Sequence, residues 1–426
     1  MRDRDAGAVY LVLQGATALL QTTTWTTAAI YLINVAHLGP LQLVLLGTIM
    51  EASILVFEIP TGVAADTAGR RRSIIVGTVI MGAALVLTGA IPWFPALLAS
   101  QALWGLGETF TSGATQAWLA GEVGDRAAAG LFLRAAQYRR LAAAAGIGLA
   151  VGLANLSLGL PLIAGGALQL TLGGWLLVAM RETGFHREAS EAARSGRRRT
   201  VAGLWAQLAS TAGQGLGAAR RDRVLVALLA VALLAGTSTE GIDRLWELHL
   251  LREVGVPAIG HLSPVTWFGI IEALSLSLGA AVIAPARRRI DTSDPAALCR
   301  LLLALTTVEA AGLLAFGVAV GFAPAVAAYL AYGGARGLRD PLYDAWVVPM
   351  IRPEVRATVL STIGQADAVG ETLGGPVIGV VATLATPGLA IVAAGAALVP
   401  VAAVLARLRV RVAERPTARR SKPGAS

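Results

Sequence analysis

Apolar residues fall into long runs along this chain, and each run is bounded by charged residues, glycine or proline. A membrane core about 30 Å thick requires roughly 20 apolar residues for each spanning helix. Twelve runs reach about this length, so the pattern predicts an all-α membrane protein with twelve transmembrane helices. The predicted spans cover approximately residues 8–36, 41–65, 73–92, 95–119, 141–157, 161–180, 224–248, 263–285, 296–320, 323–349, 357–385 and 388–406.

The composition supports a membrane protein. Apolar residues make up 55% of the 426 residues and charged residues only 14%, with a mean hydropathy of +0.67. In soluble proteins about a quarter of all residues are charged. The first run follows four charged residues and is too long for a signal-peptide core, so it is predicted to stay as a span. A single cysteine, Cys299, excludes an intramolecular disulfide framework.

The arginines predict the orientation of the chain. Cytoplasmic loops retain an excess of lysine and arginine. With the N-terminus inside, 30 of the 35 basic residues lie in cytoplasmic segments, and one, Arg252, lies in an outer loop. We therefore expect a multi-pass protein of a bacterial inner membrane with both termini cytoplasmic and anionic headgroups beside the arginines. The net charge of +9 then requires no nucleic-acid partner.

The longest connection divides the chain into two groups of six predicted spans. The predicted domains are an N-terminal bundle over 1–180, a cytoplasmic linker over 181–223, a C-terminal bundle over 224–409 and a basic tail over 410–426. Within the linker, apolar residues at helical spacing predict an amphipathic helix on the membrane surface. The alternative is a partly disordered linker. The apolar residues are Val201, Leu204, Trp205 and Leu208.

An internal repeat relates the two groups of spans. Shifting the chain by 228 residues places Trp118 on Trp346 and Gln137 on Gln365 without a gap. The fourth and fifth spans thereby match the tenth and eleventh. Parallel repeats of this kind build transporters that work by alternating access.

A short motif lies between the second and third spans. It consists of Gly62, an aspartate four residues later (Asp66), a glycine three further on (Gly69), and then Arg70 and Arg71. The motif resembles the loop signature of the major facilitator superfamily. The resemblance implies two pseudo-symmetric six-helix bundles, with spans 1, 4, 7 and 10 around a central cavity and spans 2, 5, 8 and 11 at the interface between bundles.

Physical roles follow for the residues of this motif. Gly62 is expected to let the helix end pack closely, and Gly69 to turn the chain. Asp66 is expected to accept hydrogen bonds from a neighbouring helix N-terminus. The arginines are expected to pair with acids after the fourth span, such as Glu122 or Asp125.

The fourth span indicates which members of this superfamily the chain resembles. Leu97 to Gly107 is similar to the signature of proton-coupled facilitators, with Gln101 where arginine is usual and Trp104 where glutamine is usual. The chain as a whole resembles bacterial drug:proton antiporters of the tetracycline-resistance type. The glycine-proline signature expected on the fifth span is found instead on its repeat partner, at Gly375 and Pro376.

Acids outnumber bases inside the predicted spans. The spans contain twelve aspartates and glutamates and four arginines, which gives −8 inside the membrane and +17 outside. Because desolvation disfavours a buried charge, several of these carboxyls must be protonated or face a wet cavity. Carboxyls that can change protonation suit a proton-driven carrier. The residues predicted to carry proton coupling are Glu108, Arg336, Glu51, Asp367 and Glu371.

Glu108 and Arg336 are repeat partners of opposite charge on two expected cavity helices, so we expect Glu108 to titrate in a state coupled to Arg336. The alternative is a permanent charge lock between the bundles. Asp367 is likewise the repeat partner of a charge of opposite sign, Arg139.

Two further clusters of charge are predicted to act as gates. On the tenth span, Arg336 and Asp340 are four residues apart and predicted to pair, with Pro341 interrupting the hydrogen-bond ladder and kinking the helix beside them. A static ion pair near the inner end is the alternative. On the seventh span, acids and an arginine predict an outer gate or a solvated outer end. The two clusters comprise Arg339, Asp340 and Asp344, and Glu240, Asp243, Arg244 and Glu247.

Amides, hydroxyls and indoles near the charges predict a cavity for a mixed polar and aromatic molecule. Threonine-rich faces also pack tightly against neighbouring helices, which is the alternative for the first span. The residues predicted to line the cavity are Gln21, Trp25, Gln101, Trp104, Glu240, Asp243 and Tyr332.

The predicted function is proton-coupled export of amphipathic, drug-like compounds by a monomer. The alternative is a proton-coupled metabolite importer of the same fold, and a third possibility is a non-transporting receptor. The sequence has no phosphate-binding loop, and its sole lysine is Lys422. Its four histidines show no metal-ligand pattern, so we expect no cofactor, no metal and no enzyme activity.

Overall fold

The computed structural model describes residues 2–183, 223–260, 262–290, 294–351 and 356–414. Within these ranges every regular element is a helix. The helices before the 184–222 segment form one group, called here the N-half. They are α1 (Arg2–Asn34), α2 (Pro40–Ala68), α3 (Arg70–Ala90), α4 (Phe94–Thr111), α5 (Ala114–Val123), α6 (Asp125–Leu156) and α7 (Leu160–Ala179).

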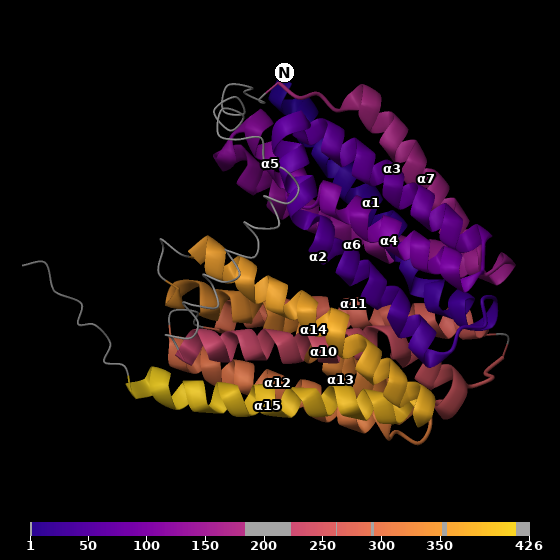
Figure 1. The fold of residues 1–426 in the computed structure, drawn as a ribbon, viewed down its shortest axis with the longest axis vertical. Coiled ribbons are helices and arrows are strands. Elements are labelled where there is room, and N and C mark those ends of the chain that lie inside the picture. The colour runs from indigo at the N-terminus through magenta and orange to yellow at the C-terminus, as the bar shows by residue number, and fades with distance from the viewer. Residues whose placement is uncertain (1, 184–222, 261, 291–293, 352–355, 415–426) are drawn as a thin grey trace, which may run out of the picture.

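The helices after that segment form the second group, called the C-half, and Figure 1 shows the two halves as distinct bundles. Because α4 and α5 follow one another in the fourth predicted span, each half supplies six spans, and the predicted fold class is confirmed. The C-half consists of α10 (Arg223–His249), the π-helix η1 (Leu250–Val254), α11 (Pro264–Arg289), α12 (Pro295–Gly317), α13 (Phe322–Val347), the 3₁₀ turn η2 (Val348–Met350), α14 (Arg356–Leu384) and α15 (Pro387–Glu414).

The predicted amphipathic helix of the linker, over Val201 to Leu208, lies outside the described residues. So do residues 415–426 of the predicted basic tail. The predicted domain limits therefore stay predictions.

Two helix boundaries differ from the predictions. The fourth span breaks at Ser112 and Gly113, where Gly113 has a φ of 66°. The fifth span begins at Asp125 instead of 141, because the alanine-rich stretch predicted as a loop has high helix propensity. The tenth span runs through Pro341 as one helix, α13, in line with the predicted span. Prolines are tolerated in membrane helices where neighbouring groups satisfy the freed carbonyl.

Six described helices are long and apolar enough to span a membrane by composition alone. The other spans, α1, α4 with α5, α6, α11, α13 and α14, carry more glycine, amide, hydroxyl or charged residues. Four of these helices line the central cavity described below, which explains their polarity. The six apolar segments are Pro40–Ala68, Arg70–Ala90, Leu160–Ala179, Val224–Val254, Pro295–Gly317 and Pro387–Leu408.

The helices run between two ends of the molecule. The termini end holds Arg2, Glu414 and the residues that flank the 184–222 segment. The far end holds the connections at 35–39, 91–93, 157–159, 255–260, 318–321 and 385–386.

The halves contact each other mainly through α2 against α14 and α6 against α11. These are spans 2, 11, 5 and 8, as the resemblance implied for the interface. A methyl group at Gly379 would lie 3.2 Å from Val44, which shows how closely α14 approaches α2. The backbone amide of Leu41 donates to the Thr383 hydroxyl across this interface at 3.2 Å.

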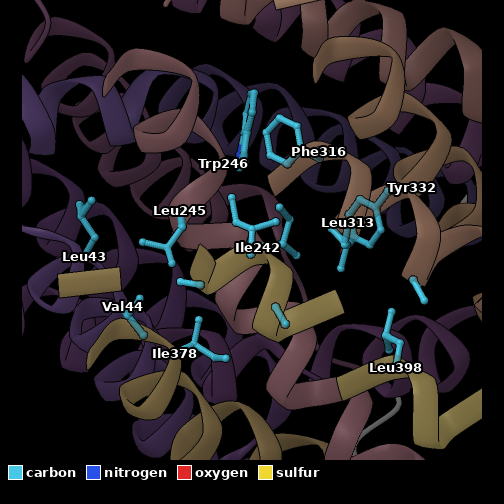
Figure 2. Packing of buried hydrophobic residues seen from close by; sticks show 14 of the residues in the cluster. Leu43, Val44, Ile242, Leu245, Trp246, Leu313, Phe316, Tyr332, Ile378 and Leu398 are labelled. Atoms are coloured by element: carbon cyan, nitrogen blue, oxygen red, sulfur yellow. The ribbon is translucent and has the colours of Figure 1, made fainter. Parts of the chain in front are cut away.

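The apolar core extends across the interface only toward the far end. Figure 2 shows Leu43 and Val44 of α2 packed beside Leu245 of α10 and Ile378 of α14, all in one cluster. A second, separate cluster fills the termini end of the N-half and includes Trp118 with residues of α1, α3 and α7. The halves are therefore joined at the far end, and in Figure 1 their helices diverge toward the termini end.

Candidate functional site

A central cavity of about 430 Å³ lies between the halves. Each half contributes three helices to its wall, so the cavity exists only when the two bundles are assembled. From α1, α2 and α4 the lining comprises Gln21, Thr22, Trp25, Thr26, Ala28, Ala29, Leu32, Leu43, Leu46 and Gln101. From α10, α11 and α13 it comprises Asp243, Arg244, Trp246, Glu247, Glu272 and Tyr329.

Aromatic rings form opposite parts of this wall. Trp25 of α1 packs edge-on against Trp104 of α4, with ring centroids 5.5 Å apart at 88°. In the C-half, Trp246 stacks on Tyr329, with centroids 4.5 Å apart at 16°. Trp104 thus supports the predicted cavity residue Trp25. The amphipathic rings give the cavity flat apolar surfaces beside its polar groups.

Two ion pairs fix the charged side of the cavity. Within α10, Arg244 Nε lies 3.1 Å from Glu240 Oε1, as the spacing of four predicts. Arg336 of α13 donates to both carboxylate oxygens of Asp243, at 2.9 and 3.4 Å. It also donates to the Tyr332 hydroxyl at 2.9 Å. These contacts hold α13 against α10 and orient Asp243 at the cavity wall.

The same wall carries acids beyond these pairs. Glu247 and Glu272 line the cavity, and no ion pair among the described residues contains either one. Glu247 is 6% exposed, and its Oε2 accepts no hydrogen bond from the described part of the chain. Glu240 is buried as well, at 3% exposure. Glu240 and Glu247 are thus buried, whereas Asp243 is exposed at the cavity wall, and the predicted outer gate or partly solvated outer end of the seventh span stays a prediction.

Glu51 and Glu371 meet across the interface between the halves. Glu51 lies on α2 and Glu371 on α14, and their carboxyl groups hydrogen-bond to each other. The sequence predicted a role for each residue separately. The structure brings them together, next to Arg244 and Asp243 of the cavity wall.

The C-half encloses a cavity of its own, of about 260 Å³, called here the C-half cavity. Arg339 lies in its wall, 3.2 Å from Glu309 and 2.9 Å from Asp340. The predicted pair of Arg336 with Asp340 is thus replaced, because Arg336 turns toward Asp243 and Asp340 pairs with its neighbour. The charged residues of this lining are Arg336, Arg339, Asp340, Asp344, Asp367 and Glu371.

The N-half encloses a third cavity, of about 250 Å³, called the N-half cavity. It holds Glu108 and Arg139, and Arg139 donates to the Gln14 amide oxygen at 2.8 Å. Glu108 and Arg336 therefore line separate cavities in separate halves. Arg336 contacts Asp243 in this structure, and the predicted coupling of Glu108 to Arg336 stays a prediction.

The two internal cavities are repeats of each other. Eight positions in the N-half lining reappear in the C-half lining after a shift of 228 residues. The repeat read from the sequence therefore extends to spans 3 and 9. The pairs are Ile74 and Leu302, Thr78 and Thr306, Glu108 and Arg336, Thr111 and Arg339, Ser112 and Asp340, Thr115 and Tyr343, Gln116 and Asp344, and Arg139 and Asp367.

The motif loop lies at the termini end and ties helix ends together. Gly69 ends α2 with a φ of 106°, as expected for a turn. Glu182 accepts hydrogen bonds from the backbone amides of Arg70 and Arg71, at 2.7 and 3.3 Å. Glu182 thus takes the part expected of Asp66, which is exposed.

Arg70 and Arg71 of the motif bind backbone carbonyls, and their predicted pairing with acids after the fourth span stays a prediction. Arg70 donates to the carbonyl of Ala117 at 2.8 Å, and Arg71 to those of Met180 and Leu177 at 2.6 Å. Arg71 therefore binds the C-terminal end of α7, where helix carbonyls lack partners, whereas Arg70 binds a carbonyl in the first half of α5. A methyl group at Gly62 would meet nothing within 4 Å, so the close packing expected there is absent.

A contact between a buried histidine and a glutamate at the far end was not predicted from the sequence. His249 Nδ1 lies 2.7 Å from Glu253, and Nε2 lies 3.0 Å from the Phe316 carbonyl. Glu253 also accepts from the Gly388 amide at 2.9 Å, so the pair links α10, α12 and α15. The spacing of four residues between His249 and Glu253 could have indicated this contact. It was missed because the predicted span ended at residue 248, before both residues.

Comparisons with known proteins support the fold. No model of a known protein family matches the sequence, and no curated protein is similar to it in sequence. The nucleoside transporter NupG superposes with a TM-score of 0.75 at 13% identity, over 95% of this chain and 98% of that chain. A mutant of the peptide transporter POT gives a TM-score of 0.69 at 15% identity, over 97% of this chain and 99% of that chain.

A structure described as a study of substrate recognition in proton-dependent oligopeptide transporters gives a TM-score of 0.68 at 14% identity. It covers 96% of this chain and 100% of that chain. These neighbours are transporters and not enzymes. The chain therefore has the fold of the major facilitator transporters, as the loop motif implied.

Proposed function

We propose that this protein is a proton-coupled secondary transporter that takes up a small polar organic solute by alternating access. The observation that carries the proposal is the central cavity, whose wall is shared between two repeated bundles. A cavity of about 430 Å³ falls within the roughly 300–1,000 Å³ of small-molecule sites. Rocking of one half against the other would expose this cavity to each side of the membrane in turn.

The packing of the halves supports an assignment of the conformational state. Contacts between halves gather at the far end, where Leu41 binds Thr383 and Asn155 accepts from Ser263 at 2.6 Å. The arginine-rich segments lie at the termini end, which we take as cytoplasmic. The cavity is then closed to the outside, and the structure corresponds to an inward-facing state.

The lining supports a solute that combines a ring with hydrogen-bonding groups and a positive or amine-bearing end. Trp25 and Trp246 offer flat surfaces, and Gln21 and Gln101 offer amides. Glu272 and its neighbours give the wall an excess of negative charge, which favours a cationic group. Nucleosides and short peptides, the solutes of the structural neighbours by their names, offer rings, amides or amines and are the first candidates to test.

Uptake replaces drug export as the favoured direction. Export of tetracycline-like compounds was the first expectation from the sequence, and the structural neighbours give it no support. Uptake, the alternative, agrees better with neighbours that carry nucleosides and peptides. The buried acids suit protons as the driving ion. Among the predicted coupling residues, Glu51, Glu371 and Asp367 fit this role better than a Glu108 and Arg336 pair.

The test uses the purified protein in liposomes that contain a pH-sensitive dye. Nucleosides, di- and tripeptides, aromatic amines and tetracyclines are added outside one at a time, without an imposed gradient. Symport carries protons inward with the solute, so the lumen becomes more acidic. Antiport carries protons outward, so the lumen becomes more alkaline and drug export is favoured.

The matched controls are empty liposomes and the Gln101→Leu variant. Gln101 is 2% exposed and faces the cavity, so this change removes a binding amide while preserving side-chain volume. An acidification that Gln101→Leu leaves at the wild-type level would contradict solute binding in the central cavity. Absence of any solute-dependent pH change across the panel would contradict proton coupling.

A further inference from the structure

The hydrogen bond between Glu51 and Glu371 has a chemical requirement. An ionised carboxylate can only accept a hydrogen bond, so a bond between two carboxyls needs a proton on one of them. The two side chains come from different halves, on the helices that form the main contact between the bundles. One proton would thus be held between α2 and α14.

The surroundings favour this shared proton. Acids face the pair from several elements, and Arg244, the described base beside Glu51, is already bound to Glu240 at 3.1 Å. Arg336 and Arg339 lie farther along the C-half cavity, next to Asp367, and are paired with Asp243 and with Glu309 and Asp340. Two adjacent carboxylates without a free counter-ion repel each other, and one proton removes the repulsion. The charged groups near the pair are Glu108 on α4, Glu240, Asp243 and Arg244 on α10, and Asp367 on α14.

Glu371 also lines the C-half cavity, and this gives the pair a path to one side of the membrane. Asp367 lies one turn before Glu371 on α14, so both carboxyls face the same cavity. The lining on α14 begins at Ile363, and eight residues of helix cover roughly 12 Å toward the termini end. On α13 the same cavity reaches Asp344, close to the helix end at the termini end.

Buried hydroxyls give the C-half cavity groups that can bind water. The side-chain oxygens of Thr306 and Tyr343 border it, and neither hydrogen-bonds to any described residue. Buried polar groups are nearly always satisfied, by protein or by ordered water. A polar cavity needs only about 10–15 Å³ to hold one water, and this one measures about 260 Å³. Water held in such a cavity can carry protons between carboxyl groups.

The central cavity does not reach the pair. Neither Glu51 nor Glu371 is among the described residues that line it. Asp243 and Arg336 stand between the two spaces, since Asp243 lines the central cavity and its partner Arg336 lines the C-half cavity. The path of a proton through the C-half is thus separate from the space that holds the solute.

We infer that Glu51 and Glu371 form a two-carboxyl proton site that exchanges with the termini side through the C-half cavity, apart from the solute cavity. The O–H bond of the protonated carboxyl breaks, the proton passes to cavity water near Asp367, and two carboxylates remain. Their repulsion weakens the contact of α2 with α14 and favours opening at the far end. This inference rests on the proposed proton-coupled transport and deepens it.

The site can be tested without a solute. Infrared difference spectra of the purified protein, wild type minus variant, report the carbonyl band of a protonated carboxyl. Glu51→Gln and Glu371→Gln should each remove one such band, because the new amide can donate to the remaining carboxylate. The control Glu58→Gln changes an exposed glutamate on the same helix as Glu51 and should leave the band. A band that persists at full intensity in both test variants would overturn the proton site.

The route is tested by the rate at which this band shifts in heavy water. Gly364 lines the C-half cavity, and a methyl group there would meet no atom within 4 Å. Gly364→Leu should fill the cavity and slow the shift at least severalfold. The matched control is Gly148→Leu, at a helical glycine that also has open space around it. A wild-type rate in Gly364→Leu would overturn the route.

These readouts separate the two proposals. If the liposome assay shows no proton coupling while the band and its dependence on Glu51 and Glu371 persist, the proposed function fails and the site stands. If coupling is observed but the band is unchanged in both glutamine variants, the function stands and this inference fails.

Discussion

The N-half cavity and the C-half cavity occupy equivalent places in the repeat and have nearly equal volumes, about 250 and 260 Å³. Their chemistry differs. The lining of the N-half cavity contains one acid, Glu108, and one base, Arg139, together with amides and hydroxyls. The C-half cavity places two arginines among several acids. The repeat thus preserved the position and size of the cavity, while side-chain changes made the C-half cavity the richer of the two in ionisable groups.

The helices around these cavities differ in the same way. At the repeat position where α4 ends and α5 begins, with Ser112 and Gly113, α13 continues through Asp340 and Pro341. The continuous helix keeps Arg336, Arg339 and Asp340 in register, so they can contact Asp243 and Glu309 at once. Ionisable groups can therefore be concentrated in one half of a repeated scaffold.

The largest expected effect comes from exchanging residues between the cavities. Arg339 and Glu309 form a buried pair at 3.2 Å, with side chains 14% and 1% exposed, and their repeat partners are Thr111 and Met81. Arg339→Thr leaves Glu309 buried without its base, which costs about 3–5 kcal/mol. Adding Glu309→Met replaces the whole pair and should recover most of the loss. Thermal midpoints in detergent measure both, and a double variant as unstable as the single would contradict the pairing.

The second prediction compares Asp367 with its repeat partner Arg139. Asp367→Asn should lower proton-driven solute uptake by roughly 5- to 150-fold, the usual range of coupling between two bound ligands. Solute exchange at equal pH should change much less, because it needs no net proton movement. Arg139→Gln should reduce the ratio of driven uptake to exchange by a smaller factor. Equal reductions in the two variants would show that both cavities carry protons.

The third prediction concerns helix packing. A methyl group at Gly370 of α14 would overlap the Leu233 carbonyl of α10, whereas its repeat partner in the N-half is already Ala142. Gly370→Ala should destabilise the protein by about 1–3 kcal/mol through overpacking. Gly148→Ala, at an open position of α6, should instead be neutral or stabilising by up to about 1 kcal/mol. Thermal midpoints compare them, and equal stability of the two variants would refute the close approach.

The smallest expected effects concern the side chains that cap the N-termini of α12 and α3. Asp294 caps α12 locally by accepting from the amides of Ala296 and Ala297, at 2.9 and 3.1 Å. Asp294→Ala should cost about 1 kcal/mol, and Asp294→Asn should restore most of it. At α3 the cap comes from Glu182, after α7. Glu182→Ala should therefore also raise the rate of proteolysis near residue 182. Unchanged cleavage there would mean that the cap does not hold this segment.

Much of the architecture was predictable because membrane spans leave a strong signal in one dimension. Runs of apolar residues gave the twelve spans, and an exact shift of 228 residues gave the repeat. The loop motif that includes Gly69 indicated the major facilitator fold. The errors lie at Ser112 and at Asp125, where local propensity and tertiary contacts decide whether a helix continues.

Several residues of the site could be predicted from their types and their helices, but the side chains that they contact could not. Gln21, Trp25, Gln101 and Asp243 line the central cavity, as expected from their helices. Their partners were not predictable, because each helix can rotate and slide relative to its neighbours. Buried acids were identified from the cost of placing charge in a membrane.

The sequence by itself determined the twelve-span repeat and a surplus of acids within the membrane, because hydropathy and charge are properties of single positions. Only the tertiary structure decided which charges meet. It paired Arg336 with Asp243, and it joined Glu51 to Glu371 across the interface. Pairing depends on distances between helices far apart in the chain, and these distances are set by the packing of whole bundles.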